Sequence, residues 1–272
     1  MSLQRLDIAD IQPLQELVER IFIFSTSQPF PKDDLKLILP NGLIKLIIPV
    51  SNHFSGTING FSHVLHENKI MLVGADDLPT LVNIQKDEAA INITIEFKPW
   101  GAYRFFHLNY SDLKNKAYSF SEIFGNPAQS LEEQMENKKN ISEKIRLLQL
   151  FLSERLRRSE ADTIFDYSVQ KIKETQGMIP MKSLEKKTGY TLRWLNMKFA
   201  EKIGISPKNF ASICRFQSCH SHFTQHPQAF LKEKEFYNYF YDQTHFIKEF
   251  RRFTGLPPVQ LTKSSNSFSD IF

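Results

Sequence analysis

The pattern of apolar and polar residues changes along the chain, and its first part favours β structure. In the stretch INITIEFK, residues 91–98, Ile91, Ile93, Ile95 and Phe97 share one face, and Asn92, Thr94, Glu96 and Lys98 share the other. A period of two is typical of a half-buried strand. Asn-Gly pairs at positions 41 and 59 indicate turns between Leu35 and Lys98. We therefore expect a small sheet or barrel in this part.

Beyond this β-rich part the pattern becomes helical. Asn140 can cap a helix with Glu143 three positions later, and one apolar stripe consists of Ile141, Ile145, Leu148 and Leu152. A second helix is expected over 163–175, with Gly177 and Pro180 as its stop. A chain of 272 residues is long enough for two domains. We place their boundary between about 135 and 177.

The C-terminal part contains one phrase twice, 51 positions apart, as WLNMKFAEKIGISP and HFIKEFRRFTGLPP. Each copy holds two apolar residues four apart, then a glycine and a proline: Leu195, Phe199, Gly204 and Pro207, and Phe246, Phe250, Gly255 and Pro258. Residues four apart lie on one face of a helix, glycine accepts the left-handed conformation that ends a helix, and proline prevents its continuation. Each copy therefore predicts one capped helix.

The residues before the first copy predict a second helix joined to it by a glycine turn. LEKKTGYT, residues 184–191, predicts a short helix closed at Gly189, with Thr191 as the cap of the next helix. This is the helix-turn-helix plan, in which the second helix can enter the DNA major groove. The side chains expected to project outward are Arg193, Asn196, Met197 and Ala200 in the first unit, and Gln243, Thr244, Ile247 and Lys248, after the cap Asp242, in the second. SPKNFASICRF, which begins at the cap Ser206, predicts a linking helix between the units.

The distribution of charge supports a polyanionic partner for the C-terminal part. The formal net charge is +4, but residues 178–262 carry 13 Lys and Arg against 6 Asp and Glu. Clustered cations attract phosphates and release their counterions. The two cysteines, Cys214 and Cys219, fit a reduced cytoplasmic protein. The start MSLQRLDIAD does not resemble a signal peptide, and no apolar run reaches the ~20 residues of a membrane span, so we expect no membrane partner.

The segment 178–262 resembles the DNA-binding domain of the AraC/XylS family of bacterial transcription regulators. The resemblance rests on GYTLRWLNMKFAEKIGISPKNF, on CRF at 214–216 and on YDQTHFIKEFRRFTGLPP. It implies two helix-turn-helix subdomains joined by a long helix, which read successive major-groove turns of double-stranded DNA about 34 Å apart. By position, the reading residues are Thr191, Arg193, Asn196 and Met197, then Gln243, Thr244, Ile247 and Lys248. LPNGLIKLII, LVGADD and IEFKPWGAYRFF are similar to the β-rich N-terminal domain of some members.

The resemblance implies an α+β fold with a β-rich, cupin-like or small-barrel N-terminal domain and an all-α C-terminal domain. The divisions are a sensor or dimerisation domain over 1–135, a helical connector over 136–177, the double helix-turn-helix over 178–262 and a flexible tail over 263–272. The expected function is a transcription regulator such as an activator. It is not an enzyme and uses no cofactor. Candidate partners besides DNA are a small-molecule effector, RNA polymerase and a second copy of the chain.

Four positions depart from the family pattern and support an alternative function. Glu185 and Glu235 stand where small residues are usual, Tyr239 stands where glycine is usual, and Met197 replaces a residue that is commonly Arg. A buried Glu is costly without a partner, and Met197 removes one bidentate guanine contact. The alternative is an interaction protein or co-regulator that kept the fold with weak or no DNA binding.

Two kinds of chemistry are weighed against these functions. CHSHFTQH, residues 219–226, holds one Cys and three His, but its spacing matches no closed structural zinc site. The N-terminal histidines at 53, 63, 66 and 107 lack the His-x-His pattern with a following Glu that a cupin-type metal site needs. Some proteins pair a DNA-binding domain of this kind with a methyl-accepting cysteine that repairs DNA. The first cysteine of this chain is Cys214, which excludes that chemistry in the N-terminal half.

Overall fold

The computed structural model describes residues 2–6, 14–26, 34–51, 54–58, 61–84, 90–156 and 160–266. The strands are β1 (Ser2–Leu6), β2 (Val18–Ser25), β3 (Leu37–Ile38), β4 (Lys45–Ser51), β5 (Phe54–Ile58), β6 (Phe61–Leu65), β7 (Met71–Val73), β8 (Thr80–Ile84), β9 (Ile91–Phe97) and β10 (Ala117–Ser119). The helices are α1 (Ala102–Phe106), α2 (Phe120–Phe124), α3 (Asn126–Glu136), α4 (Ile141–Leu156), α5 (Thr163–Glu174), α6 (Met181–Thr188), α7 (Leu192–Ile203), α8 (Pro207–Gln225), α9 (Pro227–Lys232), α10 (Gln243–Thr254) and α11 (Pro258–Leu261). Short 3-10 turns are η2 (Leu14–Glu16), η3 (Tyr110–Leu113) and η4 (Glu235–Asn238).

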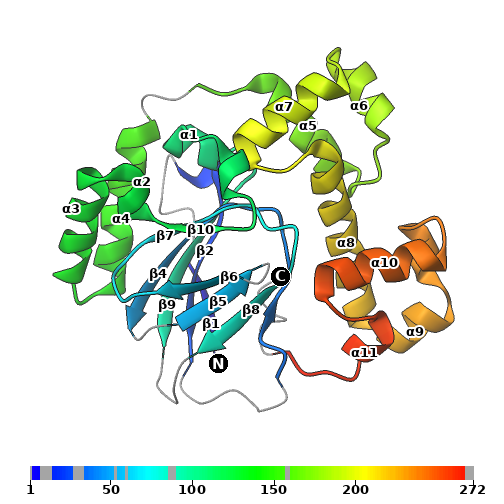
Figure 1. Cartoon of the computed structure of the whole chain (residues 1–272), viewed down its shortest axis with the longest axis horizontal. Coiled ribbons are helices and arrows are strands. Elements are labelled where there is room, and N and C mark those ends of the chain that lie inside the picture. The colour runs from blue at the N-terminus through cyan, green and yellow to red at the C-terminus, as the bar shows by residue number, and fades with distance from the viewer. Residues whose placement is uncertain are drawn as a thin grey trace.

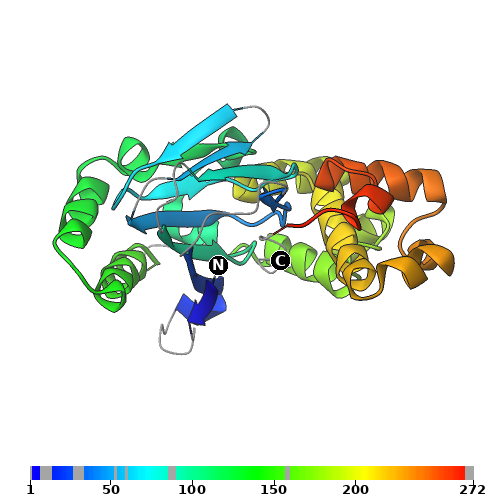
Figure 2. The same ribbon diagram turned by 90° about the horizontal axis from the view of Figure 1, so that it is seen from below.

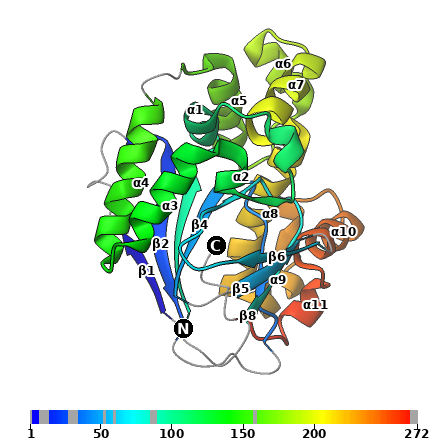
Figure 3. The ribbon, with the colours of Figure 1, turned by 60° about the vertical axis from the view of Figure 1, so that its left-hand side comes forward.

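The β region consists of two antiparallel sheets, and helices follow it along the chain (Figure 1). One sheet has the order β1-β2-β9-β4-β7-β10, and the other has the order β3-β8-β5-β6. Figure 3 shows β5, β6 and β8 in one layer and β1, β2 and β4 in another. The expected α+β class with a β-rich N-terminal region is confirmed. The second Asn-Gly pair, at 59, lies outside the described residues.

Strand β9 confirms the prediction for INITIEFK in part, because its polar face is not exposed. Ile93, Ile95 and Phe97 are buried, and so are Asn92, Thr94 and Glu96. The apolar face packs against helices, with the Phe97 ring 5.4 Å from that of Phe105. The polar face points between the two sheets, where Glu96 accepts hydrogen bonds from Arg20 and Asn41. The expectation of a half-buried strand was therefore wrong: both faces are covered, because a second sheet lies over the polar one.

Helices α3 and α4 pack beside the β region on the side away from α6–α11 (Figure 2). The predicted stripe of α4 is confirmed, since Ile145, Leu148 and Leu152 are buried. The Asn140 side chain accepts a hydrogen bond from the Ser142 backbone, as a cap does. The Lys144 ammonium donates to Asn68 Oδ1 at 2.7 Å and to the Met135 carbonyl, so α4 is held to the β7 side of the sheet.

Helix α5 packs on α6, α7 and α8, so it is part of the C-terminal group of helices. Its predicted stop is confirmed at Gly177, whose φ is +74° and whose amide donates to the Ile172 carbonyl. A Cβ at Gly177 would lie 1.9 Å from the Ala211 carbonyl oxygen of α8. Only glycine allows this approach, and the predicted connector 136–177 is therefore shared: α4 lies on the β region and α5 on the helices.

The end of the described chain returns to the β region. Ser265 forms an isolated bridge with Asp34, and the Asn266 side chain both accepts from the Leu37 amide and donates to the Leu37 carbonyl. This part of the predicted flexible tail is held by hydrogen bonds to β3, while residues 267–272 lie outside the described residues. One continuous apolar core runs through both halves, from the sheets to Phe253.

Candidate nucleic-acid interface

The first helix-turn-helix unit, α6 and α7, forms as its sequence predicts. Helix α6 ends at Gly189 with φ +77°, and the Thr191 side chain caps α7 by accepting from the Trp194 amide at 3.3 Å. Helix α7 ends at Gly204 with φ +81°. Glu185 is half-buried and accepts from the amide of Leu192. This carboxylate lies at the positive end of the α7 dipole, so Glu185 has the partner that a covered carboxylate requires.

The outward face of α7 carries the four predicted reading residues. Thr191, Arg193, Asn196 and Met197 are all exposed, whereas Leu195 and Phe199 are fully buried. The Phe199 ring packs edge-on against Phe165 of α5 at 4.9 Å. Ala200, expected to project outward, is half-buried instead. The inward and outward faces of this helix therefore follow from the spacing of its apolar residues, except at Ala200.

Helix α8 is the linking helix. The Ser206 hydroxyl caps it by accepting from the Asn209 amide at 3.2 Å, and Pro207 occupies the first turn. Phe210 and Ile213 are buried, as their spacing predicts. Cys214 packs against the core, and burial raises the pKa of its thiol to about 12. Such a thiol stays protonated and inert at neutral pH.

The second unit has the same kind of capped helix, α10, but the residues before it fold differently from those before α7. Helix α9 is followed by the 3-10 turn η4, and Asp242 then caps α10 by accepting from the His245 amide at 2.7 Å. Tyr239, which stands where the family usually has glycine, has φ −121°, a conformation that any residue adopts. The Glu235 carboxylate lies 2.7 Å from His222 Nε2. Both departures from the family pattern are therefore accommodated without a buried, unpaired carboxylate.

Helix α10 presents its predicted set in the same manner as α7. Gln243, Thr244, Ile247 and Lys248 are exposed, and Phe246 and Phe250 are buried. A shallow groove along this face is lined by Thr244, Ile247, Lys248, Arg251 and Arg252. The two arginines are absent from the set predicted from the sequence. Their spacing of four from Ile247 and Lys248 places them on the same helix face and is the signal that would have found them.

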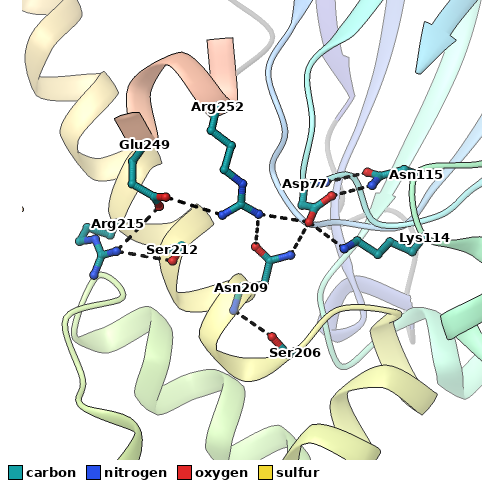
Figure 4. Close-up of polar contacts among 9 residues, drawn as sticks. All are labelled: Asp77, Lys114, Asn115, Ser206, Asn209, Ser212, Arg215, Glu249 and Arg252. Carbon is teal, nitrogen blue, oxygen red and sulfur yellow. Dashed lines mark hydrogen bonds and ion pairs between the residues drawn. The ribbon is translucent and has the colours of Figure 1, made fainter. Parts of the chain in front are cut away.

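A polar hub connects α10 to the β region (Figure 4). Its centre is Asp77, in the loop between β7 and β8, which is only 5% exposed. Asp77 Oδ2 accepts from Arg252 of α10 at 3.2 Å and from Asn209 of α8 at 2.5 Å, and it pairs with Lys114 at 2.8 Å. Asn115 bonds both the amide and the Oδ1 of Asp77. This hub joins four parts of the chain that lie far apart in sequence.

The charge at the hub is stable in the carboxylate form. Burial alone would raise the pKa of Asp77, but hydrogen bonds from Lys114, Asn115 and Asn209 outweigh it and hold the pKa below its usual value. Arg252 also donates to Asn209 Oδ1 at 2.6 Å, so the guanidinium contacts both the acid and the amide. The hub is therefore a preorganised ion pair and not a titrating site near neutral pH.

The histidines of CHSHFTQH lie in separate environments. The His220 ring packs at a tilt against Phe216, and burial lowers the pKa of His220 to about 4, whereas His222 faces Glu235 and His226 precedes α9. Within the described ranges, no three His, Cys, Asp or Glu side chains are arranged to hold a metal ion. The N-terminal histidine at 53 falls outside those ranges. Among the described helices, none combines the length and apolarity needed to cross a membrane.

Part of this chain matches a sequence family, and its fold is similar to solved structures that share little sequence identity with it. Residues 8–119 match the family described as a domain of unknown function, DUF6597. No curated protein matches the chain in sequence. One structure of ToxT from Vibrio cholerae O395 is 12% identical, covers 89% of this chain and 95% of that chain, and has a TM-score of 0.45. A second structure of ToxT from Vibrio cholerae, at 12% identity, covers 96% and 98%, with a TM-score of 0.47. A cupin domain of an XRE family transcriptional regulator from Enterobacter cloacae is 13% identical over 36% of this chain and 96% of that one, with a TM-score of 0.29.

Proposed function

We propose that the protein is a sequence-specific, DNA-binding transcription regulator of the AraC/XylS type. The observation that supports this most is the duplication of a capped helix whose exposed face carries hydrogen-bonding side chains, once in α7 and once in α10. Both helices lie in the basic segment 178–262. A basic surface supplies affinity through phosphates, and side chains on a reading helix supply specificity.

The linking helix suits a reader of two successive groove turns. Helix α8 has 19 residues, which span about 28 Å at the rise of an α-helix. Successive major-groove turns on one face of B-DNA are about 34 Å apart. Helix α7 ends just before α8, and α8 leads into α9 and then α10, so its length is of the right order to set the two exposed helix faces apart by one groove turn.

The exposed residues of α7 and α10 divide into roles by their chemistry. Arg193 can pair with guanine O6 and N7, and Asn196 and Gln243 can pair with adenine N6 and N7. Thr191, Thr244 and Lys248 suit base edges or phosphates, while Met197 and Ile247 suit apolar contact with the thymine methyl group. We assign these eight residues to DNA recognition and Arg251 to phosphate contact.

The remaining parts take the roles of a regulator and not of an enzyme. The β region, residues 1–135, is assigned to sensing a small molecule or to forming a homodimer, and 136–177 to connection with the readers over 178–262. RNA polymerase is the protein partner through which a bound regulator would act. The alternative of an interaction protein without DNA binding is decided by the following experiment.

The experiment is a selection of preferred sites from random duplex DNA, repeated with single variants. Arg193→Ala relaxes base preference in one half of the selected site and Gln243→Ala in the other, about one helical turn away, each by about 1 to 3 kcal/mol of discrimination. Arg146→Ala and Gln134→Ala, at exposed positions on α4 and α3, are the matched controls and leave the site unchanged. A selection that enriches no sequence, together with binding that does not respond to salt, overturns the proposal and favours the interaction protein.

A further inference from the structure

A cavity lies between the two sheets of the β region. Its volume is about 90 Å³, and side chains of both sheets line it, including Phe22 of β2, Ile47 of β4 and Val82 of β8. Its polar wall consists of Lys45, His63, Asp76, Asn92, Thr94 and Glu96. The wall explains why β9 buries its polar face: these side chains surround a space inside the fold.

Three atoms of this wall are buried and have no hydrogen-bond partner in the structure: Asp76 Oδ1, Asn92 Oδ1 and His63 Nε2. Asp76 and Asn92 are 3% and 2% exposed. The second oxygen of Asp76 pairs with Lys45 at 3.1 Å, so only one side of that carboxylate is engaged. Buried polar atoms are nearly always paired in folded proteins. The cavity therefore offers unused hydrogen-bonding capacity, concentrated on one wall, to a molecule that enters it.

The lining defines the chemistry of that molecule. A single water occupies about 10 to 15 Å³ on this measure of volume, so the cavity holds a molecule of roughly six to nine non-hydrogen atoms. Asp76 is paired with Lys45 and Glu96 with Arg20, so both cations are already engaged and neither is left to pair with an anion. A hydroxyl or amine can donate to Asp76 Oδ1 and to Asn92 Oδ1, while the phenylalanine and aliphatic side chains contact an apolar body.

Asp76 also adjoins the hub that holds α10. Asp77 is the next residue in the chain, and both lie in the loop between β7 and β8. Because one peptide bond joins the two residues, a shift of the Asp76 backbone would also shift Asp77. The contact of Asp77 with Arg252, at 3.2 Å, is the longest of the hydrogen bonds and ion pairs that the Asp77 carboxylate makes in the structure. Figure 4 shows that Arg252 reaches Asp77 from α10, which is the second reading helix.

We propose that the cavity between the sheets binds a small, mainly apolar molecule with an amine or hydroxyl group, and that its binding loosens the Asp77–Arg252 contact and so frees α10. The binding step stands independently of DNA recognition. The consequence for α10 as a reading helix rests on the proposed function. Both steps are therefore tested on the full chain without DNA.

Binding is tested by thermal unfolding with four probes of similar size: benzylamine, benzyl alcohol, benzoate and toluene. Benzylamine or benzyl alcohol raises the melting temperature by a few degrees at millimolar concentration in a saturable manner, and their ranking distinguishes amine from hydroxyl. Benzoate and toluene do not. Asp76→Asn weakens the better donor by about tenfold, as expected when a charge-assisted hydrogen bond is lost. Equal responses to all four probes, or none to the two donors, overturn the binding step.

A second variant protects this test against a folding defect. Ala117 lines the cavity, so Ala117→Leu fills it with three extra carbons and leaves Asp76 and Lys45 in place. We expect a cooperative melt like that of the unaltered chain and no response to either donor. A retained response in this variant places the probes elsewhere and contradicts the proposal.

Transmission is tested by hydrogen exchange of the α10 amides. The better donor accelerates exchange in α10 several-fold and leaves α7 unchanged, and Arg252→Gln reproduces the faster exchange without the probe. Saturation by the probe with no change in α10 overturns the transmission step. Since neither readout contains DNA, a failure here is distinct from a failure to select a DNA site.

Discussion

The two helix-turn-helix units share a sequence phrase but are attached to the β region by different means. The first unit packs backbone against backbone: a Cβ at Gly204 would lie 2.4 Å from the Tyr110 carbonyl oxygen of η3. Lys202 of the same helix extends over the Tyr103 ring, 4.2 Å from its centre. The second unit reaches the β region through the charged hub of Asp77 and Arg252, and the equivalent Gly255 has no atom within 4 Å of a built Cβ.

This difference shows that the repeated sequence motif determines how each helix-turn-helix unit folds, but not how that unit packs on the β region. Close backbone packing holds the first unit in one position, because packed interiors do not deform gradually. An ion pair between side chains can lengthen or exchange partners at lower cost. The second unit is therefore the one that can change its position, and the following predictions test this contrast.

The largest expected effect is a loss of stability of the same size in both units, and it tests whether the two units have equivalent cores. Phe199 and Phe250 are each fully buried at matching positions. Phe199→Ala and Phe250→Ala should each reduce the free energy of unfolding by about 3 to 5 kcal/mol, measured by urea denaturation. Arg193→Ala, on the exposed face, should change it by less than about 0.5 kcal/mol. A small effect at either Phe would show that its unit is not packed as described.

The glycines at the ends of α7 and α10 should separate the units. Gly204 and Gly255 have φ +81° and +74°. Gly255→Ala should cost about 1 to 2 kcal/mol for the left-handed backbone alone. Gly204→Ala should cost about 1 to 3 kcal/mol more, because the new Cβ meets the Tyr110 carbonyl. Equal losses in thermal melts would contradict the close packing of the first unit.

The side-chain caps of α7 and α10 should contribute different amounts to the free energy of unfolding, and this difference should be smaller than that between the glycines. Asp242 accepts at 2.7 Å and carries a charge, whereas Thr191 accepts at 3.3 Å. Asp242→Ala should lower the free energy of unfolding by about 1 to 2 kcal/mol and Thr191→Ala by about 0.5 to 1 kcal/mol. Asp242→Asn is the control and should retain most of the stability. The reverse order would mean that the α10 cap is not formed.

The last contrast between the units concerns the dependence of stability on pH, and its effect disappears at one end of the pH range. Asp166 of α5 accepts from the Tyr103 hydroxyl at 3.0 Å beside the first unit, and burial raises the pKa of Asp166 to about 6. The folded protein therefore binds the Asp166 proton more tightly than the unfolded chain does. Protonated Asp166 contributes its full stabilisation below about pH 4, and this contribution is lost as pH rises through 6. Asp166→Asn should then gain about 1 kcal/mol at pH 8, allowing for solvent screening, and nothing at pH 4.

Asp77, the residue of the β region that binds Arg252 of the second unit, supplies the opposite case. Its pKa is lowered overall, so its ionised form contributes stability at neutral pH that is lost as pH falls through the folded pKa. Asp77→Asn should destabilise the protein at pH 7 and have less effect in acid. Chemical denaturation of Asp166→Asn and Asp77→Asn at several pH values checks both, and a shared pH dependence would contradict the difference between the units.

Local features of this fold were predictable from the sequence, because they depend on neighbouring residues. The caps at Thr191, Ser206 and Asp242 follow from residue type and spacing, as does the helix stop at Gly177. The exposed positions of the eight candidate reading residues also follow from helical periodicity. Each of these features is fixed within one turn of helix.

Features that join distant parts of the chain were not predictable in this way. The alternation of β9 identified which residues share a face, but it did not show that a second sheet covers the polar one. The hub joins Asp77 to Arg252 over 175 positions, and no local pattern records such a pairing. Glu185 shows the same limit at short range, because its partner is the amide of Leu192 and a backbone group has no signature in the sequence.

The return of Asn266 to β3 has a consequence for synthesis of the chain. Strand β3 is the edge of its sheet, and the two groups of Leu37 that Asn266 engages are an amide and a carbonyl of that edge. Open strand edges are templates for pairing with other chains. During translation this edge lacks the Asn266 contacts until residue 266 has been synthesised. A truncated chain that ends after α5 therefore lacks these two hydrogen bonds at the edge of its sheet, and we expect it to self-associate through β3 more than the full chain does.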